Sequence, residues 1–162
     1  MELLSFEPAV LALAAALRAR GWRLAAAESC TGGLIAAACT ALAGSSDWFE
    51  RGFVSYSNQA KTELLGVDPA LLGRVGAVSE EVARAMVHGA LSRAPVDLAV
   101  AVTGIAGPGG AVPGKPVGTV WLAWGTARGV QAERLQLAGD RDAVRAATVH
   151  AALARLLEAA AP

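Results

Sequence analysis

The sequence VDLAVAVT, at residues 96–103, is a near-continuous apolar run that ends in a threonine. A run of this kind is typical of a strand that is buried on both faces, as in the middle of a parallel sheet. Pro95 precedes it, and the residues that follow, GIAGPGGAVPGKP at 104–116, are too rich in glycine and proline for regular structure. The sequence therefore predicts a central strand that delivers Thr103 to the start of a loop.

Helical and strand patterns alternate on both sides of this strand. Apolar spacing, caps and stops predict helices at 8–20, 34–42, 58–65 (capped by Asn58), 79–94 (opened by Ser79) and 140–159 (capped by Asp140). Short apolar runs predict further strands at 22–27, 53–56, 117–123 and 130–137. The connection between the last two is too short for a crossover, so that pair is antiparallel. The expected fold is α/β, with a mixed, mostly parallel sheet of about five strands covered by helices on both faces, and residues 1–162 form a single domain.

The composition limits the class of protein and its partners. Hydrophobic residues make up 54% of the 162 residues and charged residues 17%, which excludes a disordered chain. The net charge is zero, so no electrostatic footprint for nucleic acid or a membrane surface is present, and we expect a small-molecule partner. The longest apolar span, 34–42, is far shorter than the ~20 residues that cross a bilayer. Acidic residues stand where a signal peptide is basic, so we expect a cytoplasmic protein, with homo-oligomer formation left open.

Cysteine and histidine offer little chemistry. Cys30 and Cys39 could pair in an oxidising compartment, but in the cytosol we expect both to be inert, small hydrophobic residues. His88 and His150 are isolated, and the sequence contains no metal-ligand spacing. We therefore expect no metal site.

The turn ESCTGG, at residues 28–33, is the first candidate for catalysis. A hydroxyl at the end of a strand can attack substrate while free N–H groups at a helix start stabilise negative charge, which makes Ser29 the candidate nucleophile. The alternative is a serine or threonine helix cap followed by glycines that permit close packing. Cys30 is a rival nucleophile, but alternation along the strand points it away from the side of Ser29.

The two lysines are the second candidate feature, because the other 12 of the 14 basic residues are arginine. Unlike arginine, a lysine with a lowered pKa can act as a general base. Lys61 falls in the first turn of an expected helix, where the helix dipole lowers its pKa, although a solvated surface lysine is the alternative. Tyr56, the only tyrosine, could relay a proton or orient substrate, or else it is a sheet-edge aromatic.

Arg141 and Arg145 are the third candidate feature. They lie four residues apart at the start of the last expected helix and so share one face. Cations oppose the dipole there unless a bound anion lies between them and the N–H groups, which a phosphate would explain. The alternative is a salt bridge to Asp142 or another surface acid.

Six motifs resemble those of a known family in their order along the chain. The motifs are AESCTGGLIA, GSSDWFERGFVSYSNQAK, GAVSEEVA, AVTGIAGPGG, KPVGTVW and GDRDAVR, and the resemblance is to the CinA C-terminal domain family, most closely its stand-alone nicotinamide mononucleotide amidohydrolases. The resemblance covers about residues 8–158. It implies a three-layer α/β/α fold. It also implies hydrolysis of the carboxamide of nicotinamide mononucleotide to nicotinate mononucleotide and ammonia, without a metal or organic cofactor.

The resemblance also implies roles for individual residues. Ser29 is the nucleophile, Lys61 its base and Tyr56 a further catalytic candidate. The candidate substrate-binding set is Thr31, Gly32, Gly33, Thr103, Gly104, Lys115, Arg141 and Arg145. The competing hypothesis is a non-catalytic module that binds pyridine nucleotides, which needs Arg141 and the glycine-rich turns but neither Ser29 nor a basic Lys61.

Overall fold

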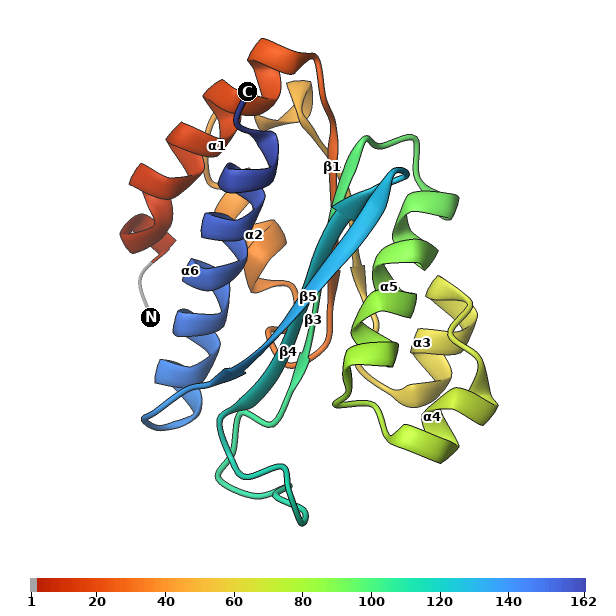
Figure 1. The fold of residues 1–162 in the computed structure, drawn as a ribbon. Coiled ribbons are helices and arrows are strands. Elements are labelled where there is room, and N and C mark those ends of the chain that lie inside the picture. Colours follow the sequence, from red (N-terminus) through yellow and green to blue (C-terminus); the bar gives the residue numbers. More distant parts are fainter. Residues whose placement is uncertain (1–2) are drawn as a thin grey trace.

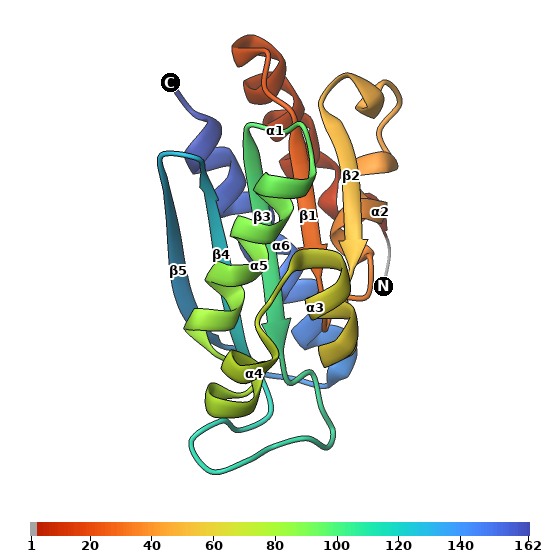
Figure 2. The same ribbon diagram turned by 90° about the vertical axis from the view of Figure 1, so that its right-hand side faces the viewer.

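The computed structural model describes residues 3–162, whose five strands form one sheet in the order β2-β1-β3-β4-β5 (Figures 1 and 2). β1 pairs in parallel with β2 and β3, whereas β4 is antiparallel to both β3 and β5. The strands are β1 (Leu24–Glu28), β2 (Phe49–Val54), β3 (Leu98–Gly104), β4 (Thr119–Thr126) and β5 (Gly129–Gln136). The mixed, mostly parallel sheet is confirmed, and β3 lies in its centre as its apolar run predicts.

Helices cover both faces of the sheet and complete a three-layer α/β/α fold (Figure 1). One face carries α1 (Glu7–Arg20), α2 (Leu34–Thr40) and α6 (Arg141–Ala160), and the other carries α3 (Asn58–Leu65), α4 (Pro69–Val75) and α5 (Glu80–Arg93). Two short 3-10 helices, η1 (Leu3–Phe6) and η2 (Ser45–Asp47), flank the first of these layers. Each layer packs its own apolar cluster against the sheet. None of the helices within residues 3–162 is long and apolar enough to span a bilayer.

The edge strand β2 begins earlier than its sequence indicates. The expected strand at 53–56 is wrong in its bounds, because the structure pairs Phe49–Val54 with β1 and leaves Ser55 and Tyr56 beyond the strand. The start of β2 could not be recognised from the sequence because it contains the charged residues Glu50 and Arg51. An edge strand that is partly open to water needs no apolar pattern.

The corner between β2 and α5 also differs from expectation. The N-cap of α3 is Ser57, whose Oγ accepts a hydrogen bond from the N–H of Ala60, and not Asn58. The helix α4 was not predicted. It has seven residues, is capped by Asp68 and begins at Pro69. Helices as short as this carry too little apolar periodicity to be recognised. In this segment α3 packs against α4 and α5 and contacts the edge strand β2.

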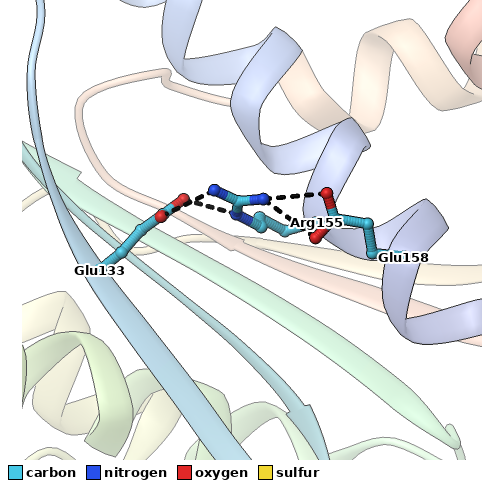
Figure 3. Close-up of polar contacts among 3 residues, drawn as sticks. All are labelled: Glu133, Arg155 and Glu158. Carbon is cyan, nitrogen blue, oxygen red and sulfur yellow. Dashed lines mark hydrogen bonds and ion pairs between the residues drawn. The ribbon is translucent and has the colours of Figure 1, made fainter.

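Arg155 ties α6 to the edge strand β5. Its guanidinium donates to both carboxylate oxygens of Glu133, at 2.8 and 2.9 Å, and to Glu158 one turn further along α6 (Figure 3). The two carboxylates raise the pKa of Arg155, so the guanidinium stays charged. The guanidinium also lies 5.7 Å from the ring centroid of Trp124 on β4. This cluster helps to hold α6 along the sheet, with the N-terminus of the helix at the end where the strands β1 and β3 finish.

Gly89 sets the distance between α5 and α3, which leads to the first prediction. A Cβ at Gly89 would overlap the carbonyl oxygen of Leu65 at the end of α3, whereas a Cβ at Gly73 in α4 would meet nothing within 4 Å. Gly89→Ala should therefore destabilise the protein by about 1–3 kcal/mol through overpacking. Gly73→Ala should stabilise it by about 0.4–1 kcal/mol, because alanine loses less backbone entropy on folding. Chemical unfolding of both variants tests this, and a stabilised Gly89→Ala variant would contradict the packing.

Candidate active site

A cleft of about 250 Å³ opens where β1 and β3 end. β1 lies between β2 on one side and β3 on the other, and ligands of open α/β sheets bind at such a point, beyond the carboxyl ends of the strands. Residues from five parts of the chain line the cleft: Ser29, Cys30, Tyr56, Asn58, Lys61, Ala77, Val78, Thr103, Gly104, Ala106 and Arg141. The fold thus gathers Ser29, Tyr56, Lys61, Thr103, Gly104 and Arg141 of the candidate set.

Ser29 is the first residue after β1 and stands in a tight turn. Its N–H donates to the carbonyl of Val102 on β3, and its own carbonyl accepts from the N–H of Gly32 at 3.0 Å. These bonds fix the backbone of Ser29 from both sides. Its hydroxyl, in a residue that is only 8% exposed, faces Lys61.

Lys61 is buried, with 1% of its surface exposed, and its amine is held by three oxygens. Nζ lies 3.1 Å from the Oγ of Ser29, and it donates to the carbonyl oxygens of Ser55 at 2.9 Å and Tyr56 at 3.3 Å. Burial lowers the pKa of Lys61, because the charged form loses its hydration. The lowered pKa expected from the sequence is thus present, with desolvation by burial as its main cause.

Tyr56 and Arg141 form the rim of the cleft. The tyrosine is 59% exposed, and its hydroxyl accepts a hydrogen bond from the Nη2 of Arg141 at 3.1 Å. Nη1 of Arg141 donates to the carbonyl of Gly107 at 2.9 Å. The backbone carbonyl of Tyr56 reaches Lys61, whereas its ring stands at the entrance beside an exposed guanidinium.

Thr103 and Gly104 form the wall at the end of β3. The hydroxyl of Thr103 donates to the carbonyl of Ala77 at 3.0 Å, which ties the start of the loop before α5 to the central strand. Gly104 allows β4 to approach, because a Cβ there would lie 2.6 Å from the side chain of Val120. The predicted end of the central strand thus lies in the cleft.

The expectation of free N–H groups at the start of α2 is wrong. The buried carboxylate of Glu28 occupies them: Oε1 accepts from the N–H of Ile35 at 2.8 Å, and Oε2 accepts from Ala36 at 3.0 Å. Glu28 was not selected from the sequence as a site residue, although its acidic side chain inside an apolar strand was a visible signal. The start of α2 is neutralised from within the protein.

Five residues of the candidate substrate-binding set lie outside the lining of the cleft: Thr31, Gly32, Gly33, Lys115 and Arg145. Thr31 is fully buried, and its hydroxyl donates to Glu28 at 2.6 Å. Arg145 donates to the carbonyl of Thr31 at 3.1 Å and lies 4.0 Å from Asp142, so the expected alternative of a salt bridge applies to it in part. Gly32 and Gly33 both have a positive φ, which the turn requires.

Lys115, the second lysine, lies beyond the lining of the cleft. Its Nζ donates to the carbonyl of Val75 at the last residue of α4, at 2.9 Å. This bond links the glycine-rich loop to α4. Asn58, Ala77 and Val78 line the cleft instead, and the sequence offered no signal for the last two, which are ordinary small or branched residues.

The thiols are unsuited to nucleophilic attack. Both cysteines are free and buried, and burial raises the pKa of Cys30 to about 11 and that of Cys39 to about 12. The side chain of Cys30 packs in the apolar cluster beneath α1 and α2, as alternation along the strand predicts. Within residues 3–162, no three histidine, cysteine or acidic side chains gather as metal ligands.

A solvent-open cleft that holds a buried lysine against a serine hydroxyl is the arrangement of an enzyme, because such a costly group is seldom kept for stability alone. The chain belongs to the CinA C-terminal domain family, whose sequence profile matches residues 7–160. This confirms the family that the six motifs resemble.

Relatives at high identity refine this assignment. The nicotinamide-nucleotide amidohydrolase PncC of Pseudomonas putida is 57% identical over 88% of this chain and 89% of its own, and that of Escherichia coli K12 is 56% identical over 80% and 79%. The crystal structure of competence/damage inducible protein CihA from Agrobacterium tumefaciens superposes with a TM-score of 0.92 at 45% identity, covering 94% of both chains. The relatives place the chain among the amidohydrolases.

Proposed function

We propose that this chain hydrolyses the carboxamide of nicotinamide mononucleotide, with Ser29 as nucleophile and Lys61 as its general base. The names of the relatives from Pseudomonas and Escherichia support the substrate. The observation that carries the mechanism is the 3.1 Å contact between the Nζ of Lys61 and the Oγ of Ser29. Residues 1–162 act as a single domain in the cytoplasm on a small molecule, without a cofactor.

The two carbonyls around Lys61 orient its amine for proton abstraction. A neutral amine has two N–H donors and one lone pair. The carbonyls of Ser55 and Tyr56 accept hydrogen bonds from the two N–H groups. The lone pair of the neutral amine therefore points at the third neighbour, the hydroxyl of Ser29. Lys61 takes this proton as Oγ attacks the carboxamide carbon. The resulting ammonium then gives a proton to the departing nitrogen, and ammonia leaves.

A second addition completes the turnover. Loss of ammonia leaves the nicotinoyl group as an ester on Ser29. Lys61, neutral again, takes a proton from a water molecule that attacks this ester, and it returns the proton to Oγ as the ester bond breaks. The product forms as the carboxylic acid, which loses its proton to the solution to give nicotinate mononucleotide, and Ser29 is free again.

The turn after Ser29 supplies donors for the negative oxygen. In a turn closed by the bond from Gly32 to Ser29, the N–H groups of the two central residues, Cys30 and Thr31, take no part in the closing bond. Among the described residues 3–162, the N–H of Thr31 has no hydrogen-bond partner, and that of Cys30 lies only against the sulfur of its own side chain. The N–H of the residue after a nucleophile is a common oxyanion donor, and we assign that role to Cys30 with Thr31.

Arg141 is the candidate phosphate ligand. It is exposed at the rim, and its guanidinium has donors beyond the two that bind Gly107 and Tyr56. A purely binding module would need Arg141 as well. Such a module gives no reason to bury a lysine against a serine hydroxyl, so the enzyme is the better account of the cleft.

The nucleophile is tested by Ser29→Ala. Turnover of nicotinamide mononucleotide, followed as released ammonia, should be lost, while affinity measured by calorimetry should stay within about tenfold, because the hydroxyl forms a bond and does not anchor the substrate. Cys30→Ala is the matched control and should remain active, because its thiol packs in the core. An active Ser29→Ala variant would refute the covalent mechanism, and inactivity of Cys30→Ala alone would transfer the role to the thiol.

The base is tested by the pH dependence and by Lys61→Arg. The rate should rise with pH through one ionisation below the ~10.4 of an ordinary lysine, because burial lowers the pKa of Lys61 and only the neutral amine accepts a proton. Lys61→Arg should be inactive, since arginine stays charged. Lys115→Arg, which changes the other lysine outside the cleft lining, should retain activity. An active Lys61→Arg variant would reduce Lys61 to an electrostatic role.

The phosphate site is tested by Arg141→Ala on two substrates. The value of kcat/KM for the mononucleotide should fall about 10- to 100-fold, the loss of about 1.5–3 kcal/mol for a hydrogen bond to a charged group. The slow hydrolysis of nicotinamide riboside, which lacks the phosphate, should hardly change. Equal losses on both substrates would show that Arg141 supports the loop at Gly107 or the ring of Tyr56 and does not bind phosphate.

A further inference from the structure

Thr31 is held from both ends although it lies outside the cleft. Its hydroxyl donates to Oε1 of Glu28 at 2.6 Å, and its carbonyl accepts from Nη2 of Arg145 at 3.1 Å. Thr31 is fully buried, and its partner Glu28 is 1% exposed. The two partners come from β1 and α6, segments that are more than a hundred residues apart in the sequence.

Each end of this arrangement is itself anchored. The carboxylate of Glu28 is fixed by the N–H groups of Ile35 and Ala36 in α2, and its residue pairs with Val54 and Val102 in the sheet. Arg145 belongs to α6, which is joined to the sheet edge by the ion pairs of Arg155. Thr31 is therefore fixed relative to the sheet, to α2 and to α6.

What this arrangement fixes is the direction of two peptide groups. Thr31 is one of the two central residues of the turn that begins at Ser29, and rotation about its backbone bonds would swing its own N–H. Holding its side chain and its carbonyl together leaves little freedom for such rotation. Oxyanion donors contribute most when they point at the developing charge before the reaction begins.

We infer that Glu28, Thr31 and Arg145 form a clamp that positions the N–H group of Thr31 for the oxyanion. The three are positioning residues and do not touch the substrate. The inference rests on the proposed function, because it assigns a role toward the same nucleophile. It also replaces the expectation that Thr31 and Arg145 bind the substrate directly.

The decisive comparison is Thr31→Val with Thr31→Ser. Valine keeps the shape of threonine but loses the donor to Glu28, so kcat should fall about 10- to 100-fold while KM stays within about threefold. Serine restores the hydroxyl, and its kcat should return to within about threefold of the wild type. The midpoint of the pH profile should not move in either variant, because the carbonyls of Ser55 and Tyr56 around Lys61 are untouched.

Thr148→Val controls for the loss of a buried hydroxyl. Thr148 is also fully buried, but its hydroxyl donates to the carbonyl of Val144 within α6. All variants are assayed well below their unfolding temperatures, with Glu28→Gln as a second test that removes the charge but keeps the length of the side chain. Thr148→Val should leave kcat unchanged, and Glu28→Gln should repeat the loss seen for Thr31→Val.

A second readout does not depend on the identity of the substrate. Ser29 attacks the phosphorus of a small serine-directed phosphonofluoridate, negative charge develops on the phosphoryl oxygen, the hydroxyl proton passes to Lys61 and fluoride leaves. The rate of this labelling, read by mass spectrometry, should fall in Thr31→Val by about the same factor as kcat. If the reagent labels the wild-type protein but that protein does not hydrolyse the mononucleotide, the substrate assignment is wrong. Comparing the labelling rates of the wild type and Thr31→Val would still show whether the clamp positions the oxyanion donor. An unchanged kcat and labelling rate in Thr31→Val, or a loss confined to KM, would overturn the clamp.

Discussion

The arrangement of the cleft depends on the hydrogen bonds that the buried carboxylate of Glu28 accepts from the turn and from α2. A buried charge is tolerated only where hydrogen bonds replace its lost water, and Glu28 has three donors, from Thr31, Ile35 and Ala36. These donors belong to the turn and to the first residues of α2. One carboxylate therefore caps the helix, closes the turn and joins both to β1, so that the nucleophile is presented by a rigid corner and not by a mobile loop.

Lys61 is also a buried ionisable residue of the cleft, but its hydrogen bonds do not fully replace the lost hydration of the charged form. Its burial disfavours the charged amine, and the three oxygens around Nζ offset that cost only in part, since the pKa remains lowered. Between this lowered pKa and the ordinary value, the unfolded chain binds more protons than the folded chain, so stability rises with pH in that window. The protein thus gives up some stability at neutral pH to keep a basic amine beside Ser29, a trade typical of catalytic groups.

The sequence predicted the layers of the fold because these depend on patterns that a chain carries locally. The apolar run of β3, the glycines after Ser29 and the short turn before β5 each had a clear signal. The contacts that organise the cleft were not predicted, because most of them join segments distant in the sequence and because the acidic residue at the end of β1 did not reveal which groups it binds. The carboxylate of Glu28 accepts hydrogen bonds from α2, and Arg145 of α6 donates to the carbonyl of Thr31. Lys115 was selected for the same reason as Lys61, the rarity of lysine in this chain, yet it binds the end of α4. Rare residue types identified candidates, but only the packing separated those in the cleft from those behind it.

The capping of the helices also determines how an anionic substrate can be recognised. The first turn of α2 is occupied by the carboxylate of Glu28, and that of α6 by Asp140, whose side chain accepts from the N–H of Ala143 at 2.9 Å. Each internal carboxylate takes the place that a phosphate could have occupied and repels one that approaches. Neither helix start is therefore open to a phosphate, and Arg141 is the one arginine that lines the cleft among the described residues 3–162. For the proposed substrate, the negative charge of Glu28 behind the turn favours binding with the phosphate at the rim, away from Ser29, and with the neutral amide pointing inward.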